Sequence, residues 1–256
     1  MVDAFFQLNP ILMGAVAATI AGLATGVGAL PVLFVKNVSE RVLDTLLGFA
    51  AGVMLSATMF SLIVPAIDLG GIWRTLVGFI AGVIFIEVAD MLLPQFHPQP
   101  GIGTEGPKST LRKTWLFAFA IAIHNFPEGL SVGVGFGTDN ISAALILALA
   151  IGLQNMPEGL AVALSLSREG YSKPRSVLYA TLTGLVEAPA GLIGAAAVII
   201  MAPLLPYALA FAAGAMLYVI SDEIIPETHR RGYEREATFG LIVGFCVMLV
   251  LDNLYG

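Results

Sequence analysis

The chain has 256 residues, of which 57% are hydrophobic and 12% are charged, and its mean hydropathy is +0.89. Soluble proteins are about 45–50% apolar and about 25% charged, so the composition excludes a soluble globular domain and predicts an integral membrane protein. The net charge of −6 indicates no particular partner, and we expect no nucleic acid to bind. The single cysteine, Cys246, excludes a disulfide framework and a thiolate metal cluster.

Eight apolar runs are long enough to cross a bilayer as helices, which takes about 20 residues each. They lie near 11–35, 43–66, 72–93, 115–137, 141–166, 176–200, 203–225 and 237–254. Open sheets are not stable in lipid, so we predict an all-α polytopic protein. A loop at 94–114, rich in proline and glycine at its start, separates the first three helices from the rest, and we expect one transmembrane domain over 1–256.

The positions of the basic residues indicate the orientation in the membrane. Eleven of them follow the first, third, fifth or seventh helix, and they are Lys36, Arg41, Lys108, Arg112, Lys113, Arg168, Lys173, Arg175, Arg230, Arg231 and Arg235. Only Arg74 falls on the other side. Because cytoplasmic loops carry an excess of Lys and Arg, we predict that these four loops are cytoplasmic and that both termini lie outside.

Two related motifs stand in the fourth and fifth predicted helices, HNFPEGL at 124–130 and QNMPEGL at 154–160. Five of the seven positions are identical. The connection at 137–140 is so short that the two helices are antiparallel neighbours. Matching motifs at similar depth therefore imply inverted-repeat pseudo-symmetry, the arrangement by which transporters place a site near the bilayer midplane. We expect the eight helices in a 3+2+3 arrangement.

Each motif presents polar side chains on one helix face, because residues four apart lie one above the other. The pairs are His124 with Glu128 and Gln154 with Glu158, with Asn125 and Asn155 beside them. Pro127 and Pro157 each remove a backbone hydrogen bond, which a membrane tolerates only where another partner or a water-filled cavity compensates. A single Pro or Asn in a membrane helix usually forms a kink or an interhelical bond. The repetition and the two buried carboxylates favour a binding site.

One imidazole with carboxylate and amide oxygens suits zinc, iron, manganese, cobalt or cadmium better than calcium or cuprous copper. Glu187 lies inside an apolar run and is followed by Pro189, so we expect it to be a further ligand on a broken helix. Glu87 is either an exit-route residue or an interhelical hydrogen-bond partner. His229 lies in a basic loop, where we expect it to be solvated.

The paired motifs, with eight spans and a loop after the third, resemble the ZIP (Zrt-, Irt-like protein) metal transporters, especially the bacterial GufA-like branch. The resemblance covers essentially the whole chain. It implies a homodimer in the bacterial inner membrane that imports divalent metal cations into the cytoplasm, zinc first and iron, manganese, cobalt or cadmium after it. The metal is then the substrate, and no catalytic cofactor is implied.

The resemblance also implies roles for single residues. Those that resemble the primary metal position are His124, Glu128, Gln154 and Glu158, with Met54 close by. Those that resemble a second position are Asn125, Asn155 and Glu187, which share Glu128 and Glu158. An entry route is represented by Ser61 and Asp68, and a cytoplasmic exit by Asp90, His97, Asp222 and Glu223. Some relatives have Asp in place of Asn155 and others His in place of Gln154, so the motif alone does not determine the preferred metal.

Two other functions are compatible with metal held between helices. An intramembrane metalloenzyme normally uses several His ligands and one water position, whereas the three histidines here, His97, His124 and His229, lie in three segments. A metal-selective channel differs from a carrier by lacking saturable, slow uptake. The family's elevator-type motion implies that helices 1, 4, 5 and 6 move as a unit against helices 2, 3, 7 and 8.

Overall fold

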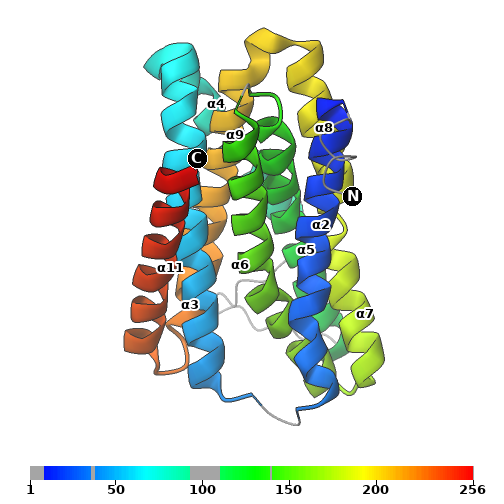
Figure 1. Cartoon of the computed structure of the whole chain (residues 1–256). Coiled ribbons are helices and arrows are strands. Elements are labelled where there is room, and N and C mark those ends of the chain that lie inside the picture. Colours follow the sequence, from blue (N-terminus) through cyan, green and yellow to red (C-terminus); the bar gives the residue numbers. More distant parts are fainter. Residues whose placement is uncertain (1–8, 36–37, 93–109, 139, 256) are drawn as a thin grey trace.

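The computed structural model describes residues 9–35, 38–92, 110–138 and 140–255, and over these residues the chain is helical, without a strand (Figure 1). Six segments in this described part are long and apolar enough to cross a membrane. They are Pro10–Leu33, Glu40–Ala89, Ile141–Arg168, Lys173–Ile200, Ala202–Thr228 and Glu234–Leu254. The prediction of an all-helical membrane protein is therefore confirmed. Helices suit this environment because they satisfy their own backbone groups in lipid.

The N-terminal part of the bundle contains two long irregular segments. Its elements are α2 (Pro10–Ala29), the 3₁₀ turn η1 (Leu30–Leu33), α3 (Glu40–Ser56), the π-helix η2 (Ala57–Ile63) and α4 (Val64–Leu92). Inside α4, Gly71 has φ +74° and ψ 166°, a conformation that only glycine adopts without strain. The chain therefore changes direction at Gly71, in the middle of the 50-residue apolar segment Glu40–Ala89.

The C-terminal part carries the two motifs and a broken helix. Its elements are α5 (Thr110–Gly135), α6 (Ile141–Arg168), α7 (Lys173–Gly184), α8 (Glu187–Ile200), the 3₁₀ turn η3 (Ala202–Leu204), α9 (Leu205–Val219), the π-helix η4 (Ile220–Ile224), α10 (Ile225–Thr228) and α11 (Glu234–Tyr255). The predicted span 176–200 is interrupted at Leu185 and Val186, which separate α7 from α8. Pro189, which has no N–H to donate, follows this break.

Side-chain caps define where three of these helices begin. The side chain of Asn9 accepts a hydrogen bond from Leu12 N at 2.9 Å, and that of Asn140 accepts one from Ala143 N at 3.1 Å. Ser39 caps α3 in the same way. Each cap satisfies one of the N–H groups that have no partner inside the helix.

Glycines bring helix backbones into direct contact and divide the helices into two sets. In the first set, here the α2 set (α2, α5, α6, α7 and α8), the contacts include Gly22 with Gly184, Gly129 with Glu187 and Gly159 with Thr25. In the second, the α3 set (α3, η2, α4, α9, η4 and α11), they include Gly52 with Leu241 and Gly82 with Phe211. A Cβ at any of these glycines would fall between 1.8 and 2.4 Å from the backbone of the partner. Among the described glycines, every such neighbour belongs to the same set.

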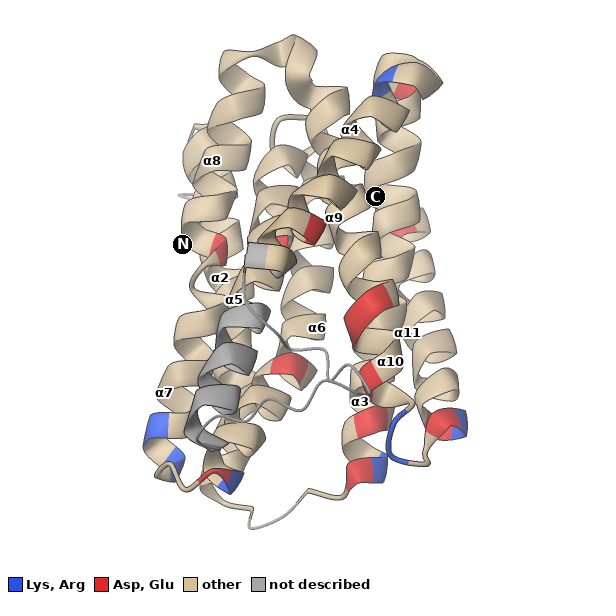
Figure 2. Cartoon of the chain, turned by 180° about the vertical axis from the view of Figure 1, so that it is seen from behind, with Lys and Arg blue, Asp and Glu red and all other residues tan. Residues whose placement is uncertain are grey.

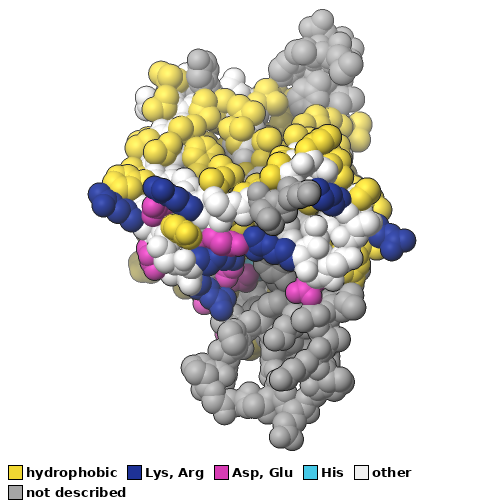
Figure 3. Space-filling view, turned by 90° about the horizontal axis from the view of Figure 1, so that it is seen from below, with side chains coloured by type: hydrophobic (Ala, Val, Ile, Leu, Met, Phe, Trp, Pro, Cys, Tyr) yellow, Lys and Arg dark blue, Asp and Glu magenta, His cyan; other side chains and the backbone are white. Residues whose placement is uncertain are grey.

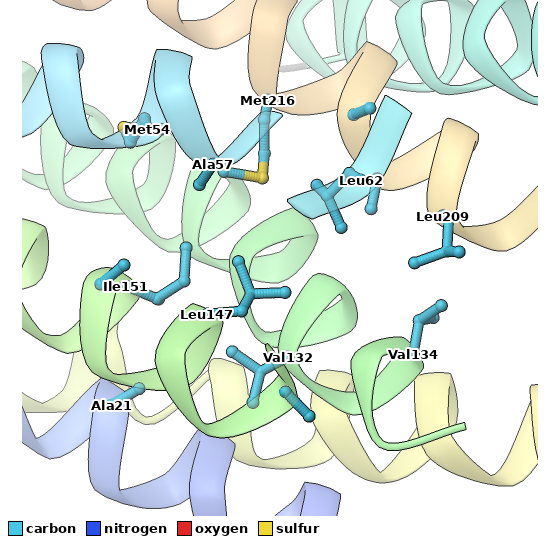
Figure 4. Packing of buried hydrophobic residues seen from close by; sticks show 14 of the residues in the cluster. Ala21, Met54, Ala57, Leu62, Val132, Val134, Leu147, Ile151, Leu209 and Met216 are labelled. Atoms are coloured by element: carbon cyan, nitrogen blue, oxygen red, sulfur yellow. The ribbon is translucent and has the colours of Figure 1, made fainter. Parts of the chain in front are cut away.

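The two sets meet instead through apolar side chains (Figure 4). The α3 set contributes Met54, Ala57, Leu62, Leu209 and Met216, and the α2 set contributes Val132, Val134, Leu147 and Ile151. Methionine side chains adapt to irregular surfaces more readily than branched ones. Among the described residues, the interface between the sets therefore lacks the glycine-mediated backbone contacts that hold each set together.

Charged residues gather at one end of the bundle, whereas the opposite end carries few of them (Figure 2). Figure 3 shows the charged end, where Lys and Arg side chains lie beside Asp and Glu. Ion pairs connect the loops at the charged end: Arg168 lies 2.6 Å from Glu40, and Arg231 lies 3.3 Å from the same carboxylate. Lys173 donates to the carbonyl of Val35 at 3.1 Å. The loops that follow η1, α6 and α10 thus lie side by side.

Because α3 and α11 approach closely, adding one methyl group at their contact is predicted to lower the stability of the protein strongly. Gly52→Ala places a Cβ 1.9 Å from the Leu241 carbonyl oxygen, so the helices must separate, at a cost of about 3 kcal/mol or more. Gly170→Ala is the matched control, because Gly170 has φ +91° but open space around it, and only backbone strain of about 1–2 kcal/mol is expected. Thermal unfolding in detergent compares them, and equal stability of the two variants would contradict this packing.

Candidate metal site

The two motifs and Glu187 meet inside the α2 set. All seven motif and Glu187 side chains expected to bind metal are 6% exposed or less, and they are His124, Asn125, Glu128, Gln154, Asn155, Glu158 and Glu187. Pro127 and Pro157 lie within α5 and α6, which continue past them. A Cβ on Gly129 would lie 2.4 Å from the Glu187 Cα. The glycine of the first motif therefore brings the start of α8 directly against α5, next to Glu128.

Asn155 connects three helices through its side-chain amide. Its Nδ2 donates to Glu187 Oε1 at 2.6 Å and to the Ala21 carbonyl at 2.9 Å, and its Oδ1 accepts from Gln154 Nε2 at 2.8 Å. Both amide hydrogens and the amide oxygen are therefore used. As a result, the Asn155 side chain faces the Glu187 carboxylate with a hydrogen-bond donor, and its amide oxygen faces Gln154 instead.

Several buried oxygen atoms in this region have no hydrogen-bond partner among the described residues. They are both carboxylate oxygens of Glu128, Glu158 Oε1, Glu187 Oε2, Gln154 Oε1 and Asn125 Oδ1. A buried carboxylate without a partner is costly, and inside a membrane it is found where it binds an ion or a proton. This set of oxygen atoms can coordinate a cation.

His124 faces the other helix set. Its Nε2 lies 2.6 Å from Glu223 Oε1 of η4. Glu223, which the resemblance assigns to the exit, therefore contacts the histidine assigned to the primary position. Among the described residues, no three His, Cys, Asp or Glu side chains already surround a point that could hold a metal ion. His124 is held by Glu223 and Glu187 by Asn155, so closing a site around one ion requires these side chains to rotate.

Both π-helices carry residues that the resemblance assigns to the route. In these segments the backbone hydrogen bonds join residues five apart instead of four. Val64 N donates to Met59 O in η2, and Ile225 N donates to Ile220 O in η4. Each slip is followed by a proline, Pro65 and Pro226, which has no N–H to continue the ordinary ladder. Such π segments occur frequently at functional sites.

At the other expected positions, the structure differs in detail. Met54 is buried in the apolar cluster between the sets, where Figure 4 labels it with Ile151. Ser61 donates to Asp252 Oδ1 at 2.6 Å. Asp68 is exposed and Asp222 is partly buried in η4.

His97 and the side chain of Asp90 lie outside the described residues. Glu87 accepts a hydrogen bond from the Tyr218 hydroxyl, so of its two interpretations the interhelical hydrogen bond is the one observed. The expectation that His229 is only solvated is wrong. Its Nδ1 lies 2.8 Å from the Ile225 carbonyl oxygen, because the last carbonyls of a helix, here α10, need partners outside it.

Three polar residues have positions that the sequence analysis did not anticipate. Asp252 is the partner of Ser61 although it lies 191 residues away. Asp44 is fully buried and pairs with Arg231 at 2.5 Å. Thr25 is a fully buried residue of α2 next to Gly159 and Gly184. Asp44 and Asp252 each lie inside a predicted apolar run, and this position could have indicated that they have polar partners.

Comparison with known proteins covers nearly the whole chain. The family model described as ZIP Zinc transporter matches residues 103–252. The chain is 44% identical over 253 residues to the zinc transporter GufA of Myxococcus xanthus, covering 95% of this chain and 99% of that protein. It is 41% identical over 271 residues to the zinc transporter ZIPB of Bordetella bronchiseptica, covering 100% and 86%, and 36% identical over 317 residues to human zinc transporter ZIP11, covering 89% and 93%.

Together with the apolar helices, these similarities identify a multi-pass protein of the bacterial inner membrane. The family model matches more than half of the chain, and the relatives match almost all of it. This chain therefore belongs to the ZIP zinc transporter family.

Proposed function

We propose that this chain imports divalent transition-metal cations, zinc foremost, into the cytoplasm. The observation that carries this function is the burial of three carboxylates, Glu128, Glu158 and Glu187, with oxygen atoms that no described residue satisfies. A divalent cation supplies the charge that neutralises such oxygens in an apolar medium. The relatives named as zinc transporters support zinc, and the mixed imidazole, carboxylate and amide set also admits iron, manganese, cobalt and cadmium.

The proposed topology has eight spans in a 3+2+3 arrangement within one domain, with both termini outside. Two features support it: Gly71 divides the 50-residue apolar segment, and α5 supplies a further helix of 26 residues. The gathering of described basic residues at one end supports a cytoplasmic position for that end (Figure 2). We further propose a homodimer, as in the family.

The proposed ligands are those of the two motifs together with Glu187 and Met54, and the proposed route passes from one end of the site to the other. At the outer side, the Ser61–Asp252 pair and Asp68 offer oxygen atoms to an entering cation. At the inner side, the contact between His124 and Glu223 supports an exit through η4, which also carries Asp222. Asp90 and His97 are further proposed exit residues.

A carrier, rather than a channel, is favoured by the way the two helix sets meet. All proposed ligands except Met54 lie in the α2 set. Backbone contacts at glycines hold each set together, whereas the sets meet through apolar side chains and through the polar pairs Arg168–Glu40 and His124–Glu223. Relative displacement of the sets therefore breaks no glycine-mediated contact, and we propose that the α2 set carries the cation past the α3 set.

Removing a proposed ligand should abolish transport without unfolding the protein. Glu128→Ala and Glu158→Ala are each expected to reduce zinc uptake in proteoliposomes to background, because each removes a carboxylate from the cation and leaves the helix packing intact. Glu234→Ala, which removes an exposed carboxylate at the start of α11, is the matched control and should transport normally. Full uptake by a correctly inserted Glu128→Ala protein would refute the site.

Tying the two sets together should stop transport. Arg168 and Glu40 lie 2.6 Å apart across the sets, so Glu40→Cys with Arg168→Cys, bridged by a short bismaleimide in a Cys246→Ser background, is expected to transport before cross-linking and not after. Arg41→Cys with Glu236→Cys replaces a pair inside the α3 set, and its cross-link should leave uptake unchanged. Normal uptake with complete cross-linking between 40 and 168 would rule out relative movement of the sets.

Charge arithmetic predicts one strongly bound cation and a weaker second one. The three ionised carboxylates Glu128, Glu158 and Glu187 carry −3, so one divalent cation leaves −1 and two leave +1, an uncompensated buried charge. The Asn155 amide, which donates to Glu187, further disfavours a cation there. Asn155→Asp adds a fourth negative charge and removes that donor, so it should strengthen the second position.

Calorimetry with zinc, together with metal analysis of the purified protein, measures this effect. Asn140→Asp serves as control, since it adds the same charge at the exposed cap of α6, where Asp also caps well. Two equally tight cations in the native protein, unchanged in Asn155→Asp, would contradict the electrostatic argument.

A further inference from the structure

Thr25 lies at the junction of three helices of the α2 set. Its backbone contacts α6 at Gly159, where a Cβ would fall 1.8 Å from the Thr25 carbonyl oxygen. Its hydroxyl oxygen lies 2.4 Å from the position that a Cβ on Gly184 would occupy. Gly159 follows Glu158, and Gly184 ends α7 three residues before Glu187. A fully buried hydroxyl is thereby placed between α6, which carries Glu158, and the end of α7, which precedes Glu187.

The Thr25 hydroxyl has no hydrogen-bond partner among the described residues. Five other buried threonine and serine side chains in the helices donate to a carbonyl three or four residues earlier, and they are Thr75, Ser131, Ser176, Thr183 and Thr228. Ser56 of α3 and Thr58 of η2 are, like Thr25, buried without a described partner, but they lie outside the α2 set. For Thr25 the carbonyl four residues earlier belongs to Ala21, and it accepts from Asn155 Nδ2 at 2.9 Å. The network that holds the proposed ligands thus uses one of the acceptors that a helical threonine at this position ordinarily has.

The neighbours of Thr25 on α2 also face the site. Ala21 bonds to Asn155, and a Cβ on Gly22 would lie 3.3 Å from the Glu187 Cβ. Residues 21, 22 and 25 share one helix face at 3.6 residues per turn, so Thr25 belongs to the face that meets Asn155 and Glu187. Glu187 Oε2 is itself without a partner. Two unsatisfied oxygen groups are therefore contributed to this junction, one from α8 and one from α2.

We propose that Thr25 is a further oxygen donor for the transported cation, on the α2 side of the site beside Glu187. This inference rests on the proposed function, in which the cation binds at Glu128, Glu158 and Glu187. A buried hydroxyl without a partner destabilises the protein, and a methyl of the same shape would not. A hydroxyl at this position is useful if the cation, or a water molecule bound to it, engages the hydroxyl oxygen.

The substitution Thr25→Val separates this role from packing, because it preserves shape and removes the hydroxyl. Binding of zinc to the purified protein, by competition with a fluorescent chelator, should weaken about threefold to tenfold, the range expected for one neutral hydrogen-bonding group. The melting temperature without metal should stay the same or rise. Thr25→Ser, which restores a hydroxyl, should bind zinc more tightly than Thr25→Val, and Thr25→Ala should show the same weakening if the valine variant does not fold.

Thr75→Val is the matched control, since Thr75 is buried in α4 of the other set and bonds to the Gly71 carbonyl at 3.1 Å. It should lower the melting temperature and leave zinc affinity unchanged. Glu128→Ala, measured in parallel, distinguishes the two hypotheses. If Glu128→Ala loses binding while Thr25→Val and Thr25→Ala bind as the native protein does, the role of Thr25 alone is overturned. If Glu128→Ala also binds normally, the proposed site fails, and the role of Thr25 with it.

Discussion

Three carboxylates, Glu128, Glu158 and Glu187, are buried between helices in an apolar medium, and much of the structure follows from the need to hold them there. A carboxylate at this depth is tolerated when a cation, a proton or donors compensate it. One such donor is present in the Asn155 amide, which binds Glu187. Oxygen atoms of the other two have no partner among the described residues. The unsatisfied atoms thus define where a cation would be most strongly held.

Placing these side chains requires helices that deviate from regular geometry. Prolines lie inside α5 and α6, a break separates α7 from α8, and π segments occur at η2 and η4. The break and the π segments change the face on which the following side chains lie. Glycine contacts within each set compensate by allowing backbones to approach closely. The set that holds the carboxylates is consequently well packed internally and separated from the other by apolar side chains.

Local features of the site could be predicted from the sequence, because spacing within a helix determines which residues share a face. The pairing of Glu187 with a nearby proline indicated the broken helix. The contact of His124 with Glu223 could not be predicted, since the π slip in η4 rotates the residues that follow it and depends on tertiary packing. Nor could the unsatisfied hydroxyl of Thr25 be predicted, because helical threonines ordinarily donate to a carbonyl of their own helix. Eight apolar runs were identified in the sequence, and Gly71, where the backbone turns, lies in the gap between the predicted spans 43–66 and 72–93.

The position of the bound metal is the most direct test of the central claim. Crystals of the protein loaded with zinc, or with cadmium in its place, would show the ion as an anomalous scattering peak. The peak is expected within about 2.0–2.2 Å of Glu128 and Glu158 carboxylate oxygens and His124 Nε2 for zinc, with His124 released from Glu223. A single strong peak elsewhere in the protein, with these carboxylates free of metal, would contradict the proposed site.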